Sequence, residues 1–439
     1  MSLAIFNIND AGLQLSLNGD LIDTSRGYAV LDGNKLMVGE EAAQNTKLLT
    51  GWTNNKFWNQ LTTAPIKGKK NQIRHHADLA FAHLEDLWEP ISDKAQAALF
   101  IVPGHYHGEN LSLLLGIAKE CNIPVRGVVD NSILAASDLP LRRHVIHLDL
   151  HLHSITLTCL TANGHSIARS TVDVVVETGL TTLLDRWADI IANQLIQTTR
   201  FDPMHDADSE QQLFNLLPNW IRQLGPEQMY SFSMNAVETE HTVAVSRENL
   251  LRACAPIYPQ IVQAIRTKIP SGAKTSLLLS HQFEGFPGLK ESLQLISDIE
   301  IIHLHASKIN DSAYLYRDQI LSPSDSAITH ILKLDLSSET EQESSNNAES
   351  APTHILLKDI AYPIGKGRRL PIDDSAHQKD ESQTSSVYFR NGELILETSD
   401  SQHATVNNTP VESTSKLRTG DIIEYMGQRA AVITVIEDG

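Results

Sequence analysis

One short segment brings a carboxylate, two imidazoles and a hydroxyl together. Residues 144–160 read H-V-I-H-L-D-L-H-L-H-S-I-T-L-T-C-L, so an apolar strand ends near Asp149, and His151, His153 and Ser154 follow before a second alternating strand. Backbone N–H groups in a tight turn can bind phosphate oxygens where glycine leaves no Cβ in the way. In this turn His151 and His153 place two side chains there instead.

Two His-x-His pairs offer imidazoles to a metal ion. They are His105 with His107, and His151 with His153. Imidazole nitrogens bind zinc and other transition metals, but no cysteine or carboxylate cluster with matching spacing accompanies the pairs. We therefore predict no metal site, and we expect these imidazoles to fill space and to hydrogen-bond to one another or to water.

Strands and helices alternate through residues 1–335 and must position this turn. Apolar runs and alternating runs predict strands, and apolar positions spaced by three and four predict helices. Their mixture indicates an α/β fold with mixed sheets. The expected strands are 3–8, 13–17, 97–102, 125–129 and 277–279, and the expected helices are 110–121, one from about 132, 183–197 and 250–269.

Two further regions follow. Residues 336–352 are acidic and rich in serine and lack apolar periodicity, which is typical of a flexible linker. Residues 353–439 contain short alternating runs separated by turn sequences such as Asn391-Gly392, which predict a small all-β domain.

Composition limits the function. A net charge of −18 argues against nucleic acid or an anionic membrane as the main partner. No apolar run reaches the ~18 residues of a membrane span. Cys121, Cys159 and Cys254 lie far apart in apolar contexts and predict reduced core residues. We therefore expect a cytoplasmic protein that binds neither nucleic acid nor membrane.

Five loop segments occur in an order that a known family shares. Asp149 to Ser154 is similar to a second phosphate loop, D-x-G-x-G-[TS], and Leu279 to Leu289 is similar to an adenosine loop, G-G-x-x-x-x-P-x-[VL]. With segments 36–43, 100–104 and 129–136, the order resembles the nucleotide-binding domain of DnaK-type heat-shock chaperones, in the actin-like ATPase superfamily. The resemblance implies a two-lobed actin-like fold over residues 1–335, with a cleft between two mixed sheets.

The positions that hold nucleotide in that family are altered here. Asn7 stands at the aspartate of the first phosphate loop, or Asn9 does if the register shifts, and Asn131 stands at a family glutamate. Losing a carboxylate that positions water or metal costs orders of magnitude in rate. We also expect His151, His153 and His281, all at glycine positions, to occlude the cleft. The cleft positions implied by the resemblance are Asn7, Asp10, Asp149, His151, His153, Ser154, Gly179, Ser280 and His281.

These losses together predict a pseudo-ATPase that serves as a protein-interaction or assembly scaffold and binds no cofactor. The alternative is an active chaperone-type ATPase. Such an enzyme would bind ATP or ADP with magnesium, use Asp149 in catalysis, and assist a specific client protein.

The C-terminal motifs resemble a second family. Segments 364–366, 391–394, 401–408 and 417–423 are similar to the I-G-R, D-G-x-x-x-L, S-x-N-G-T-x-V-N-G and L-x-x-G-D-x-I motifs of forkhead-associated (FHA) domains. The resemblance implies an FHA-like β-sandwich over residues 353–439 whose loops bind a protein partner, phosphorylated or not. A module that only packs or assembles remains an alternative, as does a shrunken chaperone substrate domain. The partner-binding residues that the resemblance implies are Lys366, Arg368, Arg369, Ser401, His403 and Asn407.

Overall fold

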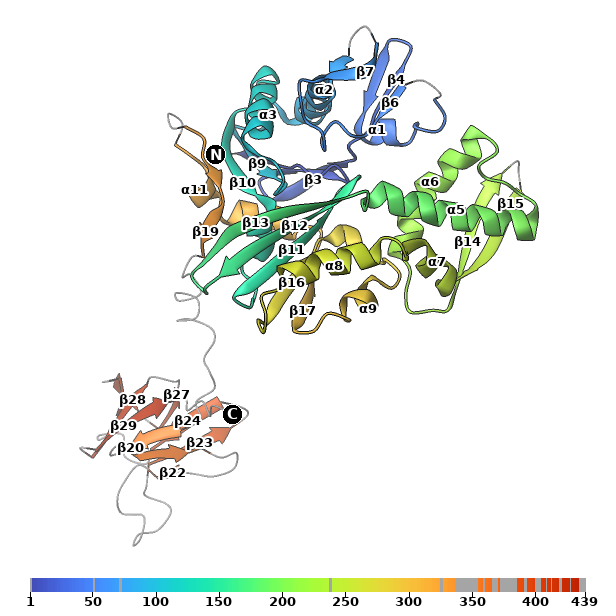
Figure 1. Ribbon diagram of the computed structural model, residues 1–439. Helices are drawn as coiled ribbons and strands as arrows, with labels where there is room; N and C mark the ends of the chain where they lie inside the picture. Colours follow the sequence, from blue (N-terminus) through green and yellow to red (C-terminus); the bar gives the residue numbers. More distant parts are fainter. Residues whose placement is uncertain are drawn as a thin grey trace. The chain divides into compact units, whose positions relative to one another are not determined.

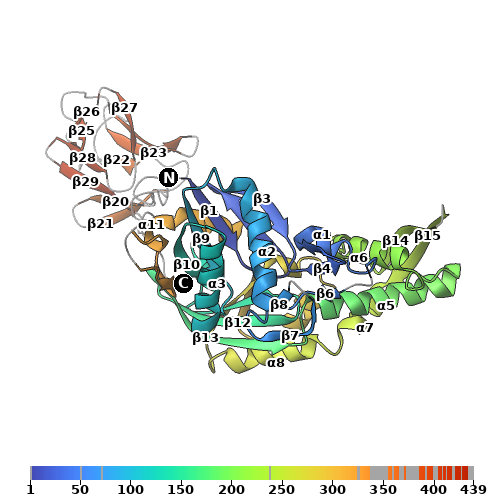
Figure 2. The same cartoon turned by 90° about the horizontal axis from the view of Figure 1, so that it is seen from above.

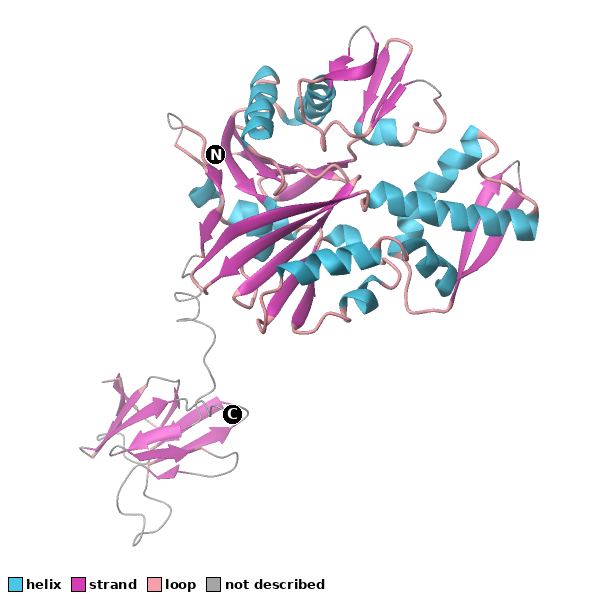
Figure 3. Ribbon diagram, viewed as in Figure 1, coloured by secondary structure: helices cyan, strands magenta, loops and turns pink. Residues whose placement is uncertain are grey.

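The computed structural model of the chain divides into two compact units, residues 1–336 and 337–439 (Figure 1). Helices and strands are both abundant (Figure 3), which confirms the expected mixed α/β class. The predicted linker, 336–352, lies outside the described residues except for Leu336. The structure describes residues 2–49, 52–70, 73–236, 239–323, 327–336, 354–357, 360–364, 370–371, 385–390, 393–398, 404–407, 409–411, 413–417, 421–426 and 428–433.

The first sheet is built around the N-terminal strand. β1 pairs antiparallel with β2 and parallel with β9, which pairs parallel with β10. β1 and β9 are buried along their whole length, which explains their continuous apolar sequences. The strands in spatial order are β18 (His330–Ile331), β10 (Val125–Asp130), β9 (Ala97–Val102), β1 (Leu3–Asn7), β2 (Leu13–Leu17) and β3 (Asp20–Ser25).

The second sheet repeats this arrangement. β11 pairs antiparallel with β12 and parallel with β16, which pairs parallel with β17. Five strands of each sheet thus share one order, with three antiparallel strands followed by two parallel ones. The sixth strand is β18, parallel to β10, in the first sheet and β19, antiparallel to β13, in the second. We call residues 3–130 the first half and residues 144–303 the second half. The strands in spatial order are β17 (Ile299–His303), β16 (Thr275–Leu279), β11 (His144–Leu150), β12 (Ser154–Ala162), β13 (Ser166–Val176) and β19 (Lys333–Asp335).

Alternation along β11 decides where its polar residues point. Ile146 and Leu148 belong to the core of the second half, whereas Val145 belongs to the core that also contains Leu3 and Ile5 of the first sheet. Because side chains alternate between the faces of a strand, Asp149 shares the face of Val145. The strand therefore directs Asp149 toward the first half.

The helices pack in three hydrophobic cores. The outer face of the first sheet is covered by α2 (His76–Trp88), η1 (Glu89–Ile91) and α3 (Gly108–Glu120). The core shared by the two sheets includes α4 (Asn131–Ala136), α10 (Lys308–Leu315) and α11 (Arg317–Ile320). The second half adds α5 (Leu180–Thr199), α6 (Ala207–Arg222), α7 (Arg247–Cys254), α8 (Tyr258–Lys268) and α9 (Leu289–Leu293).

The prediction of one helix over 250–269 is wrong, because the chain forms α7 and α8 there. Pro256 lacks an N–H group and cannot continue α7, and Pro259 lies in the first turn of α8, where proline is tolerated. The sequence patterns also missed β3, β13, β17, α6, α10 and other elements. Among the others are β4 (Ala29–Asp32), β5 (Lys35–Val38), α1 (Gly39–Ala43), β6 (Trp52–Asn54), β7 (Pro65–Lys70), β8 (Ile73–His75), β14 (Met229–Ala236), β15 (Thr239–Ser246) and η2 (His281–Phe283).

The second unit consists of two antiparallel sheets around one apolar core that includes Ile355, Val387 and Ile423. The first sheet contains β21 (Ile360–Pro363), β20 (His354–Leu357), β29 (Gln428–Ile433), β28 (Ile422–Tyr425), β25 (Ala404–Val406) and β26 (Thr409–Pro410). The second contains β22 (Leu370–Pro371), β23 (Ser386–Arg390), β24 (Glu393–Glu397) and β27 (Thr414–Leu417).

Candidate functional site

Two turns meet between the halves. The turn after β1 carries Asn9 and Asp10, and the other turn follows β11. Asn9 Nδ2 donates to Asp149 Oδ1 and to the Leu150 carbonyl, at 3.1 Å each. Asp10 Oδ1 accepts a hydrogen bond from the Leu152 amide at 2.8 Å. Protein groups therefore tie the two turns directly to each other.

His151 lies between two carboxylates and is only 2% exposed. Its Nδ1 is 3.5 Å from Asp10 Oδ1, and its Nε2 is 3.3 Å from Asp149 Oδ2. Burial opposes protonation, but the charges of Asp149 and Asp10 outweigh it and raise the pKa of His151. Burial likewise acts to raise the pKa of Asp10, but His151 and the Leu152 amide reverse this and lower it. The geometry favours an imidazolium between two carboxylates.

Each oxygen of the Asp149 carboxylate accepts a hydrogen bond from an asparagine amide. Asn131 Nδ2 donates to Asp149 Oδ2 at 2.6 Å, while Asn9 donates to Oδ1. The amide of Asn131 donates a hydrogen bond to Asp149, whereas a carboxylate at this position could only accept one. Asp149 therefore has little capacity left for a metal ion or a water nucleophile.

A second imidazole closes the cluster. The His105 ring meets the His151 ring edge to face, with centroids 5.1 Å apart. Burial, followed by the charge of His151, lowers the pKa of His105 to about 3, so this ring is neutral. Asp10, His105 and His151 border a cavity of about 10 Å³, which has room for about one water molecule. The first pair of predicted histidines thus contributes only His105 to the cluster.

Carbonyl groups of the β11–β12 turn accept hydrogen bonds from the first backbone amides of α5. The Leu180 amide donates to the His151 carbonyl at 2.9 Å, and the Thr181 amide donates to the Leu152 carbonyl at 3.0 Å. A Cβ at Gly179 would lie 2.4 Å from three backbone atoms of residues 152–154, so the close approach requires glycine. Free amides at a helix start can bind phosphate, but here the turn occupies these two.

His153 and Ser154 fasten the same turn to the first half. His153 Nε2 donates to Asn55, whose carbonyl oxygen and Oδ1 are each 3.0 Å away. Ser154 Oγ accepts from Asn59 Nδ2 at 3.3 Å. The roles of Asn55 and Asn59 could not be predicted from the sequence, because their local pattern does not indicate a partner about a hundred residues further along the chain.

A separate contact joins the halves beside α1 and α6 (Figure 2). Gln211, which is buried, donates to the Ala43 carbonyl at 3.1 Å and accepts from the Lys47 amide at 2.7 Å. The Lys47 ammonium lies 2.7 Å from Glu210 and 4.1 Å from the centre of the Phe214 ring. The two halves are therefore held together on both sides of the space between them.

Three predicted positions lie outside the His151 cluster. Asn7 donates to Gln14 at 3.5 Å, which joins β1 to β2. Ser280 Oγ accepts from the Leu150 amide at 3.3 Å, which joins the end of β16 to the end of β11. Burial lowers the pKa of His281, which lines a cavity of about 350 Å³ between the halves. We expected His151, His153 and His281 to occlude the whole cleft, and this is wrong for the cavity of about 350 Å³, which remains open.

The predicted partner-binding residues fall mostly outside the described residues: Lys366, Arg368, Arg369, Ser401 and His403. Asn407 is described and has a structural role. It has a positive φ of 49°, donates to Asp421 Oδ1 at 2.7 Å and accepts from the Ile422 amide at 2.9 Å. It thus joins the end of β25 to the start of β28.

Within the described residues, no group of three or more His, Cys, Asp and Glu side chains has an arrangement that could hold a metal ion. No helix in the described part of the chain is both long enough and apolar enough to span a bilayer.

No protein-family model matches the sequence, and no curated protein matches it significantly. The function must therefore be argued from the geometry of the chain's own site.

Proposed function

We propose that this protein is a non-catalytic relative of the actin-like ATPases, of the DnaK type, and that it serves as a protein-interaction or assembly scaffold. In this proposal a cluster of side chains takes the place of nucleotide and metal. The repeated strand order of the two sheets supports the fold assignment, because that superfamily is built from two such sheets around a cleft.

The observation that carries the proposal is the position of His151. It stands at a glycine position of the resembling phosphate loop and lies buried between Asp10 and Asp149. A protonated ring there supplies the positive charge that a nucleotide-bound metal would supply, and its volume excludes phosphate. Two carboxylates facing each other without a cation would be strongly destabilising, so His151 removes the need for a ligand at this point.

The surrounding contacts support loss of hydrolysis. Asp149 already accepts from Asn9 and Asn131, and an amide at position 131 cannot take up a proton from water. The first amides of α5 bond to the turn, so they cannot stabilise a transferring phosphate.

We assign partner binding to the second unit, as a degenerate FHA-like module in a cytoplasmic protein. Two antiparallel sheets with one core support this reading, since loops held by a rigid scaffold commonly bind partners. The proposed partner is a protein, either a phosphorylated one or a client protein.

One observation favours the alternative of an active ATPase. The cavity of about 350 Å³ is lined by Gly12, Leu180 and His281, from three loops that correspond to nucleotide-binding loops in the resembling family. Turnover of ATP with magnesium by the full chain separates the two functions. We expect no turnover, and ATPase activity that disappears in Asp149→Ala would refute the proposal.

A further inference from the structure

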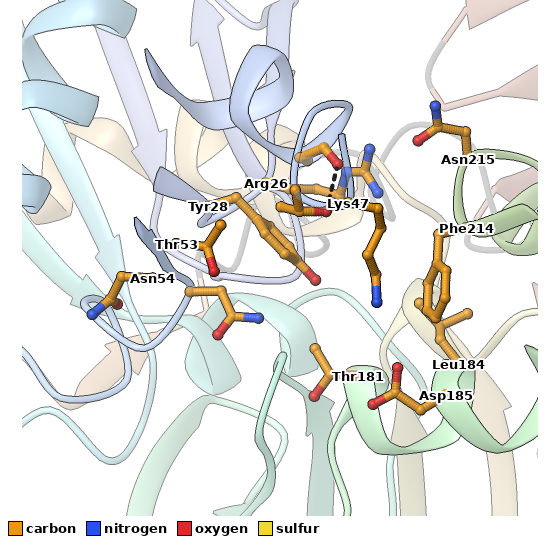
Figure 4. Close-up of a pocket in the computed structure, with 13 residues that line it drawn as sticks. Arg26, Tyr28, Lys47, Thr53, Asn54, Thr181, Leu184, Asp185, Phe214 and Asn215 are labelled. Carbon is orange, nitrogen blue, oxygen red and sulfur yellow. Dashed lines mark hydrogen bonds between the residues drawn. The ribbon is translucent and has the colours of Figure 1, made fainter. Parts of the chain in front are cut away.

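A second cavity lies between the halves, beside α1 and α6 and outside the His151 cluster. Its volume is about 260 Å³, somewhat below the roughly 300–1,000 Å³ of pockets for drug-sized ligands. One wall comes from residues 26–55 and the other from α5 and α6 (Figure 4). The cavity therefore suits a small ligand held between the two halves.

Of the charged side chains that line the cavity, Arg26 and Lys47 form ion pairs with described residues and Asp185 does not. Arg26 donates to Glu40 from Nε and Nη2, at 2.9 and 2.6 Å, and Lys47 pairs with Glu210. Asp185 also lines the cavity, yet it forms no hydrogen bond and no ion pair with any residue that the structure describes. Both cations of the lining thus already pair with carboxylates outside it. The charge of Lys47 acts on Asp185, but Asp185 is the lining carboxylate that no direct hydrogen bond or ion pair within the described residues engages.

The remaining lining suits hydroxyl groups. Amide and hydroxyl side chains both donate and accept hydrogen bonds, and several of them face the cavity together with the ring of Tyr28 (Figure 4). Leu184 and Phe214 add apolar contact surface to the wall formed by α5 and α6. The neutral polar residues of the lining are Thr46, Thr53, Asn54, Asn55, Thr181 and Asn215.

We propose that this cavity binds a small hydroxylated primary amine, with its ammonium group at Asp185 and its hydroxyl groups at the amides and threonines. The negative charges of Asp185, Asp189 and Glu210 disfavour an anion here and favour a cation over a neutral polyol. The inference is independent of the proposed function, because the cavity lies outside the cluster around His151.

Calorimetric titration of the full chain with glucosamine, glucose and N-acetylglucosamine tests the ligand class. Glucosamine should bind saturably. The two uncharged sugars should bind at least about tenfold more weakly, because each lacks the charge-assisted hydrogen bond to Asp185. Equal binding of either uncharged sugar, or no saturable binding of glucosamine, would overturn the proposal.

Two matched variants test whether Asp185 binds the ammonium group of the ligand. Asp185→Asn removes the charge and keeps the shape, and Asp185 is exposed and makes no internal bond, so the fold should persist. Asp93→Asn is the control, because Asp93 is exposed in the turn after η1 and does not line the cavity. Glucosamine binding should weaken about tenfold in Asp185→Asn and stay unchanged in Asp93→Asn. Equal effects of the two variants, or no effect of Asp185→Asn, would contradict the assignment.

Discussion

At the scale of single residues, the chemistry of the cluster depends on which groups donate and which accept. Asp10 and Asp149 are the acceptors, and His151 and the amides of Asn9 and Asn131 are the donors. Residue types in the local sequence indicated Asp149 and His151, and the family resemblance implied Asp10. The contact of Asn9 with Asp149 joins residues 140 positions apart, and no local pattern could have specified it.

Replacing His151 by alanine should destabilise the larger unit. The change leaves two buried carboxylates without their cation, and breaking a buried ion pair in this way typically costs about 3–5 kcal/mol. Urea unfolding of the full chain measures the loss. His165→Ala is the control, because His165 is exposed in the turn between β12 and β13 and should change stability by less than about 0.5 kcal/mol. Equal stability of the two variants would contradict the assigned role of His151.

The stabilising effect of His151 should depend on pH. Its pKa is raised above 6.5, so its contribution is complete below that pH and is lost as the pH rises through the raised value. The pKa of Asp10 is lowered below 3.8, so its contribution is present above that pH and is lost on further acidification. The difference in unfolding free energy between wild type and His151→Ala should therefore shrink as the pH rises from below 6.5 through the raised pKa of His151. A constant difference would contradict a raised pKa for this ring.

At the scale of elements, the strands that position the cluster were predictable because their patterns are local. The apolar runs at 3–8, 97–102 and 277–279 correspond to β1, β9 and β16. The start of α5 depends on more than its own sequence, since its first amides bond to the β11–β12 turn. Such packing between elements is decided by tertiary contacts, which explains why the turn's fastening to the first half could not be predicted.

Gly179→Ala tests the packing of α5 on the turn. The added Cβ would meet backbone atoms at 2.4 Å, so the turn or the helix must shift, and overpacking of this kind typically costs about 1–3 kcal/mol. Gly116→Ala in α3 is the matched control, because a Cβ there meets nothing within 4 Å. It should stabilise by about 0.5–1 kcal/mol through better helix propensity. The two melting temperatures should move in opposite directions, and a shift in the same direction would contradict the packing argument.

At the scale of the whole molecule, the chain combines a larger α/β unit with a smaller all-β unit. The shift from mixed elements to short alternating strands was visible in the sequence, because composition changes sharply across residues 336–352. The roles of Lys366, Arg368 and Arg369 stay predictions, since these residues lie outside the described ranges.

Deleting residues 353–439 should abolish capture of a protein partner that the full chain retains in a pull-down, because the proposed binding loops lie in that region. Charge reversal at Lys366, Arg368 and Arg369 should weaken the same capture, since a basic edge attracts acidic or phosphorylated segments. If charge reversal leaves every partner bound, these loops are not the interaction site, and the second unit is better explained as an assembly or stability element.

Calorimetric titration of the full chain with ATP and magnesium tests the central claim most directly. The claim is that His151, buried between Asp10 and Asp149, leaves no place for phosphate and metal. The account predicts no saturable heat of binding and no change in melting temperature with the nucleotide. Stoichiometric binding of magnesium and ATP, lost in Asp149→Ala, would contradict it.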